Sequence, residues 1–294
     1  MARRVRGQRR DAQRVLQVER HALTAARLAT LVDRTSGTAL PLGDDLESRY
    51  GGPLRFADPG RPYVFANFVE TVDGVVSFAV PGHESAKVVS AGHPADRFVL
   101  GLLRAAADAV VVGAGTLRKE PGVVWSPRAP FPEAGEAFAR MREAMGRPAQ
   151  PLTVLVTRSG DVDLRAPAFR PEMSVLILTS REGAARIGRT PENVRVRVME
   201  RGTSAEIVAA AAEASAGRAI LTEGGPNLFG QLLRDGVVDE LFLTIAPRFA
   251  GRSEEHRRTA LVEGAAFDPE RAPATRLLSA KAADDLLLLR YATR

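Results

Sequence analysis

Two glycine-rich segments of the chain have the pattern of strand-to-helix turns that can bind a phosphate group. In the first, Thr222-Glu223-Gly224-Gly225-Pro226, an apolar run ends at Thr222 and Pro226 takes the first helical position, where a missing N–H breaks no hydrogen bond. Glycines let an anion approach the backbone, and the helix N-terminus attracts negative charge. We therefore expect a phosphate or diphosphate at Gly224 and Gly225, with a tight turn that binds no ligand as the alternative.

A second segment of this kind, Gly113-Ala114-Gly115-Thr116, follows the apolar run 108–112. Two such turns in one open sheet can close on one diphosphate at the carboxyl ends of the strands. Gly113-x-Gly115 is only part of a dinucleotide-binding fingerprint, because Arg118 occupies the position of the third glycine. A standard Rossmann domain is therefore not expected.

The ends of two further apolar runs carry a guanidinium and hydroxyl groups. Arg158 and Ser159 follow the run 152–156, and Thr179-Ser180-Arg181 follows the next run. A guanidinium suits the 2′-phosphate of NADPH, whereas a carboxylate would suit the free 2′-hydroxyl of NADH. We expect NADPH as the cofactor, although either triplet alone is also compatible with a solvated loop.

A third segment, residues 67–74, follows the first apolar run of the core and could bring Asn67, Thr71 and Asp73 into the same cleft. Asp73-Gly74 is also a common turn pair, so a simple turn is the alternative at this point. The four histidines show no ligand-like spacing, and no metal is expected.

Short apolar runs that alternate with helical stretches predict an α/β layer fold with a mixed, mostly parallel sheet. The predicted strands are residues 63–69, 109–112, 152–156, 175–178, 194–198, 219–222 and 240–245, and the predicted helices are 94–106, 204–215 and 227–233. Residues 275–281 and 284–291 are separated by too few residues for a parallel crossover. They predict a C-terminal antiparallel hairpin at the sheet edge.

The N-terminal part of the chain has a different composition. Apolar residues recur at helical spacing over 15–32, which predicts an amphipathic helix docked on the body or on a partner subunit. Residues 37–62 are rich in Gly, Pro and Asp and predict a connecting segment. We therefore divide the chain into an Arg-rich segment, 1–60, and a main domain, 61–294, in which residues 125–150 form an insertion or lid.

Composition excludes several classes of protein. The 294 residues include no cysteine, which excludes disulfides, cysteine-bound zinc and iron–sulfur clusters. No apolar run approaches the roughly 20 residues that cross a bilayer, so a cytoplasmic protein is expected. Residues 1–20 contribute +5 of the net charge of +6, which leaves the body nearly neutral and argues against a nucleic-acid partner.

These segments, in this order, resemble the reductase (C-terminal) domain of bacterial riboflavin-biosynthesis deaminase-reductases. The resemblance spans roughly residues 60–292 and also rests on Val238-Asp239-Glu240-Leu241 and Ala246-Pro247…Gly251. It implies a dihydrofolate-reductase-like three-layer fold, a homodimer and the NADPH-dependent reduction of 5-amino-6-(5-phosphoribosylamino)uracil to its ribitylamino form. With about 60 residues before the core and no cysteine, we expect a stand-alone reductase without the deaminase half.

The resemblance also implies roles for individual residues. The cofactor would be held by Gly113, Gly115, Thr116, Arg158, Ser159, Gly224 and Gly225. The substrate would be bound by Asn67, Thr71, Lys87 and Ser90, and its proton delivered by Glu223 or Asp73, with Glu223 preferred. The alternatives are a reductase of another heterocycle, such as a dihydropterin, and a catalytically silent NADPH- or nucleic-acid-binding protein.

Overall fold

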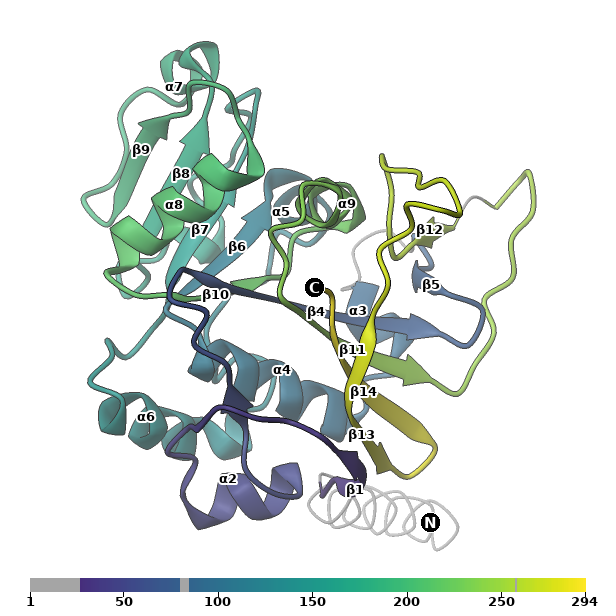
Figure 1. Ribbon diagram of the computed structural model, residues 1–294. Coiled ribbons are helices and arrows are strands. Elements are labelled where there is room, and N and C mark those ends of the chain that lie inside the picture. The colour runs from purple at the N-terminus through teal and green to yellow at the C-terminus, as the bar shows by residue number, and fades with distance from the viewer. Residues whose placement is uncertain (1–26, 80–84, 257) are drawn as a thin grey trace, which may run out of the picture.

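The computed structural model describes residues 27–79, 85–256 and 258–294, and a ten-stranded sheet runs through them (Figure 1). Its strand order is β1-β13-β14-β11-β4-β10-β6-β7-β8-β9. The strands are β1 (Ala29–Asp33), β4 (Tyr63–Thr71), β6 (Ala109–Gly113), β7 (Leu152–Val156), β8 (Val175–Thr179), β9 (Val194–Val198), β10 (Ala219–Thr222), β11 (Glu240–Ala246), β13 (Arg276–Ala283) and β14 (Leu286–Ala292). Strands β11 to β9 of this order are parallel, and β14, β13 and β1 pair antiparallel. The predicted mixed, mostly parallel sheet is therefore confirmed.

Helices cover both faces of this sheet and make three layers (Figure 1). They are α2 (Gly43–Tyr50), α3 (Ser85–Val89), α4 (Pro94–Ala106), α5 (Ala114–Lys119), α6 (Gly135–Ala144), α7 (Arg181–Ile187), α8 (Ser204–Ser215) and α9 (Pro226–Arg234), with short 3₁₀ turns at Pro132–Ala134 and Pro167–Phe169. Helices α2, α4 and α6 contribute to the largest apolar core on one face, while α8 and α9 pack on the other. Two small two-stranded sheets, β2 (Thr38–Ala39) with β3 (Arg55–Phe56) and β5 (Val75–Ser77) with β12 (Thr259–Ala260), complete the fold.

The described part of the N-terminal segment packs and pairs with the main domain more extensively than its composition predicts. The end of the predicted helix 15–32 is wrong, because Ala29–Asp33 forms β1 and pairs with β13; residues 1–26 lie outside the described residues. The segment 37–62, predicted to be a connection, contains α2, whose Leu46 and Tyr50 lie in the largest core. Pairing with β13 satisfies backbone groups that a lone segment would leave to water, and this gain is invisible to local periodicity.

The predicted C-terminal hairpin is confirmed, but its surroundings differ from the prediction. Strands β13 and β14 pair antiparallel, and β1 pairs with the outer side of β13, so the hairpin does not form the sheet edge. The turn lies at Asp284-Asp285 rather than at residues 282–283, and Asp284 has a φ of 50°. Aspartate tolerates this left-handed conformation better than most residues.

Residues 125–150 are not a lid over the site. The middle of this segment forms α6, whose Phe138 is buried against α4. A Cβ on Gly101 of α4 would lie 2.7 Å from the Phe138 ring, so this glycine allows the two helices to approach closely. Of the two alternatives, the structure therefore favours an insertion, which is a packed part of the core.

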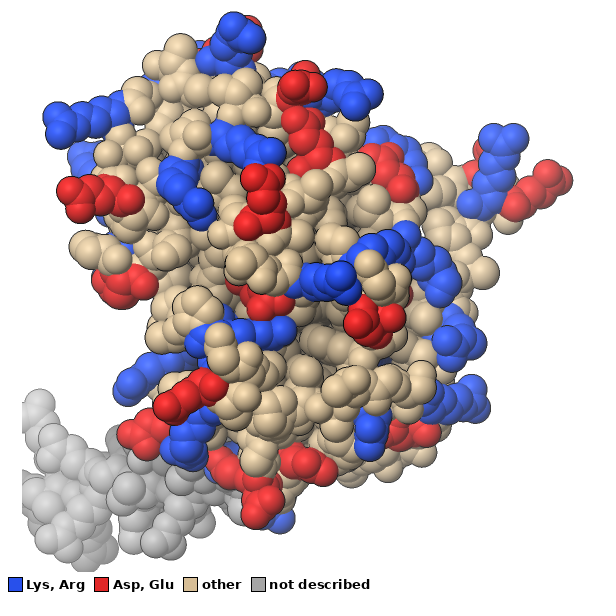
Figure 2. Space-filling model, turned by 60° about the vertical axis from the view of Figure 1, so that its left-hand side comes forward, with Lys and Arg blue, Asp and Glu red and all other residues tan. Residues whose placement is uncertain are grey.

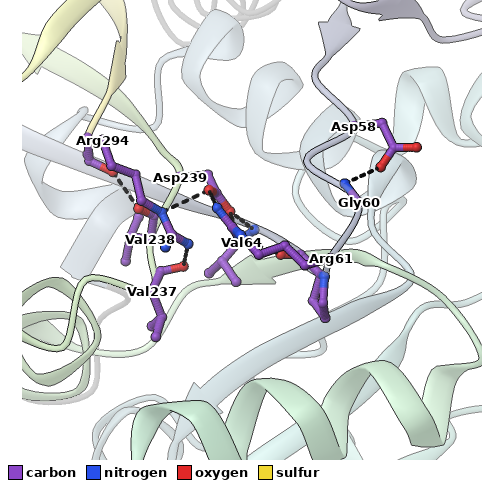
Figure 3. A network of polar contacts seen from close by, with 10 residues as sticks. Asp58, Gly60, Arg61, Val64, Val237, Val238, Asp239 and Arg294 are labelled. Carbon is purple, nitrogen blue, oxygen red and sulfur yellow. Dashed lines mark hydrogen bonds and ion pairs between the residues drawn. The ribbon is translucent and has the colours of Figure 1, made fainter.

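An aspartate joins the starts of β4 and β11 to the C-terminal end of the chain. Asp239 accepts a hydrogen bond of 2.8 Å from the Val64 N–H and lies between the guanidinium groups of Arg61 and Arg294 (Figure 3). Next to it, the buried Glu240 pairs with the buried Arg290 of β14. The acidic pair within Val238-Asp239-Glu240-Leu241 therefore fixes strand register.

Candidate active site

The two glycine turns lie side by side in the structure. They follow β6 and β10, which are parallel neighbours, so both turns lie at the same edge of the sheet. A Cβ on Gly225 would be 3.3 Å from the Thr116 hydroxyl oxygen of the other turn. Helices α5 and α9 begin at these turns without a side-chain N-cap, whereas α4, α7 and α8 are capped by His93, Ser180 and Thr203. The turns therefore present uncapped helix N-termini at one place.

A cavity of about 490 Å³ opens in front of the two turns, at the carboxyl ends of the strands. This volume lies within the range of small-molecule binding sites. Its lining includes both turns (113–116 and 223–228), the end of β7 (157–159) and Asn67 of β4. No hydrogen bond of the Asn67 side chain is found with any other described residue, so its amide can serve a ligand.

The first glycine turn has open space beside its backbone, which suits the binding of a ligand group. A Cβ on Gly113 or Gly115 would meet no protein atom within 4 Å, and neither residue has a positive φ. Protein packing and backbone conformation therefore do not require glycine at these positions. Gly224 differs, because a Cβ there would lie 2.6 Å from the Leu228 side chain. The first turn thus leaves an open cradle, whereas Gly224 serves the packing of α9.

Glu223 lies in the cavity wall and is held by an arginine that the sequence pattern did not indicate. Arg104 Nε donates to Glu223 Oε1 at 2.7 Å, and Arg104 Nη2 donates to Oε2 at 2.6 Å. Both side chains are at most 10% exposed. Such bidentate pairs are strong and fix geometry. Both oxygens of the Glu223 carboxylate therefore accept hydrogen bonds from Arg104.

The same arginine also holds the chain segment that carries Trp125. Arg104 Nη1 donates to the carbonyl oxygens of Val124 and Ser126 at 3.2 and 3.3 Å. The intervening Trp125 is buried and lines the cavity. Arg104 therefore couples Glu223 to an apolar wall of the site.

Asp73 does not line the cavity. Its carboxylate accepts hydrogen bonds from the Thr71 hydroxyl at 2.5 Å and from the backbone N–H groups of Ala250 and Gly251 at 3.0 and 2.8 Å. These bonds, that of Thr71 first, lower the pKa of Asp73 to about 2. Gly74 has a φ of 76°. The structure therefore favours the turn alternative, in which Asp73 fastens the loop that follows β11.

Three further predicted substrate ligands also lie outside the cavity lining. Thr71 is fully buried and its hydroxyl accepts from the Val75 N–H, while the buried Ser90 hydroxyl donates to the Ala86 carbonyl. Lys87 of α3 is not part of the lining. In this region the lining hydroxyl groups belong instead to Ser77, Ser85 and Thr259.

The end of β7 brings positive charge to the cavity. Arg158 and Ser159 line it, as predicted sites for the 2′-phosphate, and no ion pair of Arg158 is found within the described part of the chain. Lys119 and Arg118 of α5 line the same region, and Arg118 Nη1 donates to the Asp161 carbonyl at 3.2 Å. Arg181, from the second predicted triplet, does not line the cavity.

An aspartate that the sequence pattern did not indicate also lines the cavity. Asp96 of α4 is 6% exposed, and the side chains of Ser90 and Thr244 lie near its carboxyl group. Burial raises the pKa of Asp96, and the polar side chains of Thr244 and Ser90 and the nearby His93 oppose the rise. Asp96 and Arg104 are spaced so that they share one face of α4, and this periodicity was the available signal for both.

The chain matches the family model of the RibD C-terminal domain over residues 62–285. It belongs to this family. A relative from Archaeoglobus fulgidus, named 2,5-diamino-6-ribosylamino-4(3H)-pyrimidinone 5′-phosphate reductase, is 29% identical over 194 residues, which cover 65% of this chain and 83% of the relative. The resemblance inferred from the sequence is thereby confirmed.

Solved structures of the family have the same fold. A pyrimidine reductase-like protein from Corynebacterium diphtheriae is 25% identical and superposes with a TM-score of 0.61 over 79% of this chain and 92% of that chain. RibD from Acinetobacter baumannii, at 20% identity, also gives a TM-score of 0.61, over 80% of this chain and 59% of that chain. The predicted fold class is therefore confirmed.

The described surface gives no sign of a long basic groove on the face seen in Figure 2, where Lys and Arg are interspersed with Asp and Glu. Among the described residues, no helix is long and apolar enough to cross a membrane. The Arg-rich segment 1–20, on which the nucleic-acid alternative depended, lies outside the described residues.

Proposed function

We propose that this chain is an NADPH-dependent reductase of the riboflavin pathway, which reduces the ribosyl group of a 5-amino-6-(5-phosphoribosylamino)pyrimidine to ribityl. The family implies the uracil as substrate, and the relative from Archaeoglobus fulgidus is named for the corresponding 2-amino compound. The observation that carries the proposal is that both glycine turns and the Glu223–Arg104 pair line one cavity.

The cofactor site would extend from the glycine turns to the end of β7. Backbone N–H groups at Gly113, Gly115 and Gly225, with the Thr116 hydroxyl, would bind the diphosphate, and Arg158 and Ser159 would bind the 2′-phosphate. When bound, NADPH supplies the hydride. The apolar wall that includes Trp125 excludes water from the reacting atoms.

The ion pair with Arg104 supports a role for Glu223 other than proton delivery. In its open form the substrate is an imine, and the protonated imine nitrogen is the stronger hydride acceptor. The Glu223 carboxylate, fixed by Arg104, would accept a hydrogen bond from this N–H and stabilise its positive charge. With the hydride that bound NADPH would supply, the C=N bond would become a single bond, and the proton that the imine nitrogen had taken from solvent would stay on the neutral amine.

A direct assay tests the proposal. Purified protein is mixed with NADPH and 5-amino-6-(5-phosphoribosylamino)uracil or its 2-amino counterpart. The absorbance of reduced nicotinamide is followed over time, and the mass of the product is determined by mass spectrometry. Oxidation of NADPH with a mass gain of two hydrogens supports the proposal. Turnover of dihydropterin without turnover of either ribosylaminopyrimidine would contradict it.

The proposal includes a homodimer in the cytoplasm, as the resemblance implies. Val72 and Phe249 are 53% and 76% exposed on neighbouring loops, which are joined by a hydrogen bond from the Val72 N–H to the Arg248 carbonyl. Apolar side chains in this position suit a contact between two copies. Sedimentation of the wild type and of Phe249→Ser would test whether this surface forms the contact.

A further inference from the structure

Helix α4 places two charged groups at different points of one cavity. Asp96 and Arg104 are eight residues apart, which corresponds to about 12 Å along a helix axis. Leu100, halfway between them, also lines the cavity. Arg104 fixes Glu223 at one end, beside the glycine turns, while Asp96 stands at the other end.

The Asp96 carboxyl group is held but not saturated. The neighbouring side chains of Ser90 and Thr244 are both buried, and the Ser90 hydroxyl donates its proton to the Ala86 carbonyl. A carboxylate offers about four acceptor positions, so the one remaining hydroxyl donor, that of Thr244, leaves others available. His93 is the titratable group whose charge acts on Asp96, and its own ring lies at the start of α4. Because Asp96 lines the cavity, a ligand can reach the remaining positions.

The proposed substrate also has two ends. The reacting C1′ is attached through nitrogen to C6 of the pyrimidine, and the N3–C2 edge lies across the ring. The heterocycle with a hydrogen bond of about 3 Å at each end spans on the order of 10 Å, which is compatible with the separation along α4. With C1′ at Glu223, the N3–C2 edge would face Asp96.

The substituent at C2 decides how this edge interacts with a carboxylate. The 2-amino compound presents two adjacent donors, N3–H and the amino group, which match the two oxygens of a carboxylate. The uracil presents N3–H between two carbonyl oxygens. One of those oxygens would face a carboxylate oxygen, and neither could donate a hydrogen bond.

We propose that Asp96 binds the N3–C2 edge of the pyrimidine and makes this reductase select the 2-amino substrate over the uracil. The inference rests on the proposed function for the reaction at C1′. It places this enzyme before the reaction class that replaces the 2-amino group with oxygen, a hydrolytic deamination that must then act on the ribityl product.

A competition assay tests the selection. The wild type, with NADPH, is given equal concentrations of the two phosphoribosylaminopyrimidines, and the product ratio is read by mass spectrometry. We expect at least about a tenfold excess of the 2-amino product, because a site built for a donor pair rejects an analogue that lacks it. In Asp96→Asn, the carboxamide offers one donor and one acceptor, which match the uracil edge, so the ratio should reverse.

Two controls separate specificity from damage to the fold. Asp163→Asn removes an exposed carboxylate that pairs with Arg165 away from the cavity, and it should leave the ratio unchanged. Asp96→Glu keeps the charge and should keep the 2-amino preference with weaker binding. A wild type that prefers the uracil, or a ratio that Asp96→Asn leaves unchanged, would overturn the inference.

A binding experiment distinguishes failure of this inference from failure of the proposed function. Calorimetry with 2,6-diaminopyrimidin-4-one and 6-aminouracil, which differ only at C2, requires no turnover. Tighter binding of the diamino compound to the wild type, lost in Asp96→Asn, supports the inference even if neither phosphoribosylaminopyrimidine is reduced. Equal affinities would refute it even if reduction is observed.

Discussion

Arg104 determines what the neighbouring Glu223 can do. The carboxylate receives two charged hydrogen bonds within a wall that is almost fully buried. Its fixed negative charge can stabilise a cation in the cavity. The sequence indicated Glu223 through its place beside two glycines, but it could not indicate the partner, which lies 119 residues away.

Replacement of Arg104 by methionine should affect both stability and catalysis. The change leaves the Glu223 carboxylate buried without its partner, and breaking a buried pair in this way costs about 3–5 kcal/mol. The free energy of unfolding, measured with urea, should fall by this order, and kcat/KM should fall by roughly a hundredfold because Glu223 loses its orientation. The double variant Arg104→Met/Glu223→Gln should recover part of the stability but not the activity. An unchanged kcat/KM in Arg104→Met would contradict the assigned role.

Arg158 offers a test of cofactor preference. Arg158→Gln removes a guanidinium from the end of β7, and loss of a charged hydrogen bond corresponds to about 1.5–3 kcal/mol. The KM for NADPH should rise by roughly tenfold or more, while the KM for NADH should stay the same. Arg181→Gln is the matched control, since Arg181 follows the next strand but does not line the cavity. A similar loss for both cofactors in Arg158→Gln would show that the 2′-phosphate lies elsewhere.

At the scale of elements, the glycines of the first turn affect both the stability of α5 and, in our proposal, the binding of NADPH. In Gly115→Ala the new methyl group meets no protein atom, and alanine favours a helix by about 1 kcal/mol. The melting temperature without ligand should therefore stay the same or rise, while the Kd for NADPH should increase by about tenfold. Gly122→Ala, also in open space but outside the cavity lining, should leave the Kd unchanged. Unaltered NADPH binding in Gly115→Ala would exclude the proposed cradle.

The Asp73 contact between the β4–β5 turn and the loop after β11 should make stability depend on pH. The pKa of Asp73 is about 2 in the folded protein, against about 3.9 for a free aspartate. A lowered pKa means that the stabilisation is complete above pH about 4 and is lost as the pH falls toward 2. The melting temperature of the wild type should exceed that of Asp73→Asn near neutrality, and the difference should shrink across this acid range. A difference that is independent of pH would show that the carboxylate charge is not involved.

Elements with strong local patterns were predictable, and those that depend on distant partners were not. The boundaries of α4 and α8 agree with the predicted 94–106 and 204–215, because their apolar periodicity and caps are local. Strand β1 could not be predicted in this way, since its partner β13 lies about 250 residues further along the chain. The same reason explains the missed Asp96, whose neighbour Thr244 belongs to a distant strand.

At the scale of the whole molecule, the division at residue 60 can be tested. Leu46, Leu54 and Phe56 lie in the same core as the helices of the main domain, and Arg290 of β14 donates to the Arg55 carbonyl at 2.6 Å. A chain truncated to 61–294 should therefore expose apolar surface and lose its cooperative thermal transition, whereas the full chain should keep it. Calorimetry of both proteins provides the comparison. A truncated chain with the same melting temperature as the full chain would establish 61–294 as an independent domain.

The outer strands β1 and β9 limit how copies of this protein can associate at high concentration. Strand β9 carries Arg195 and Arg197, and Arg197 is paired with Glu213 of α8, so an incoming β9 would bring guanidinium groups against guanidinium groups. Strand β1 has only five residues, and its register shifts between Thr30 and Val32, which leaves little straight backbone for another chain to pair with. Continuous sheets across neighbouring molecules, the first step toward fibrils, are therefore disfavoured at both ends.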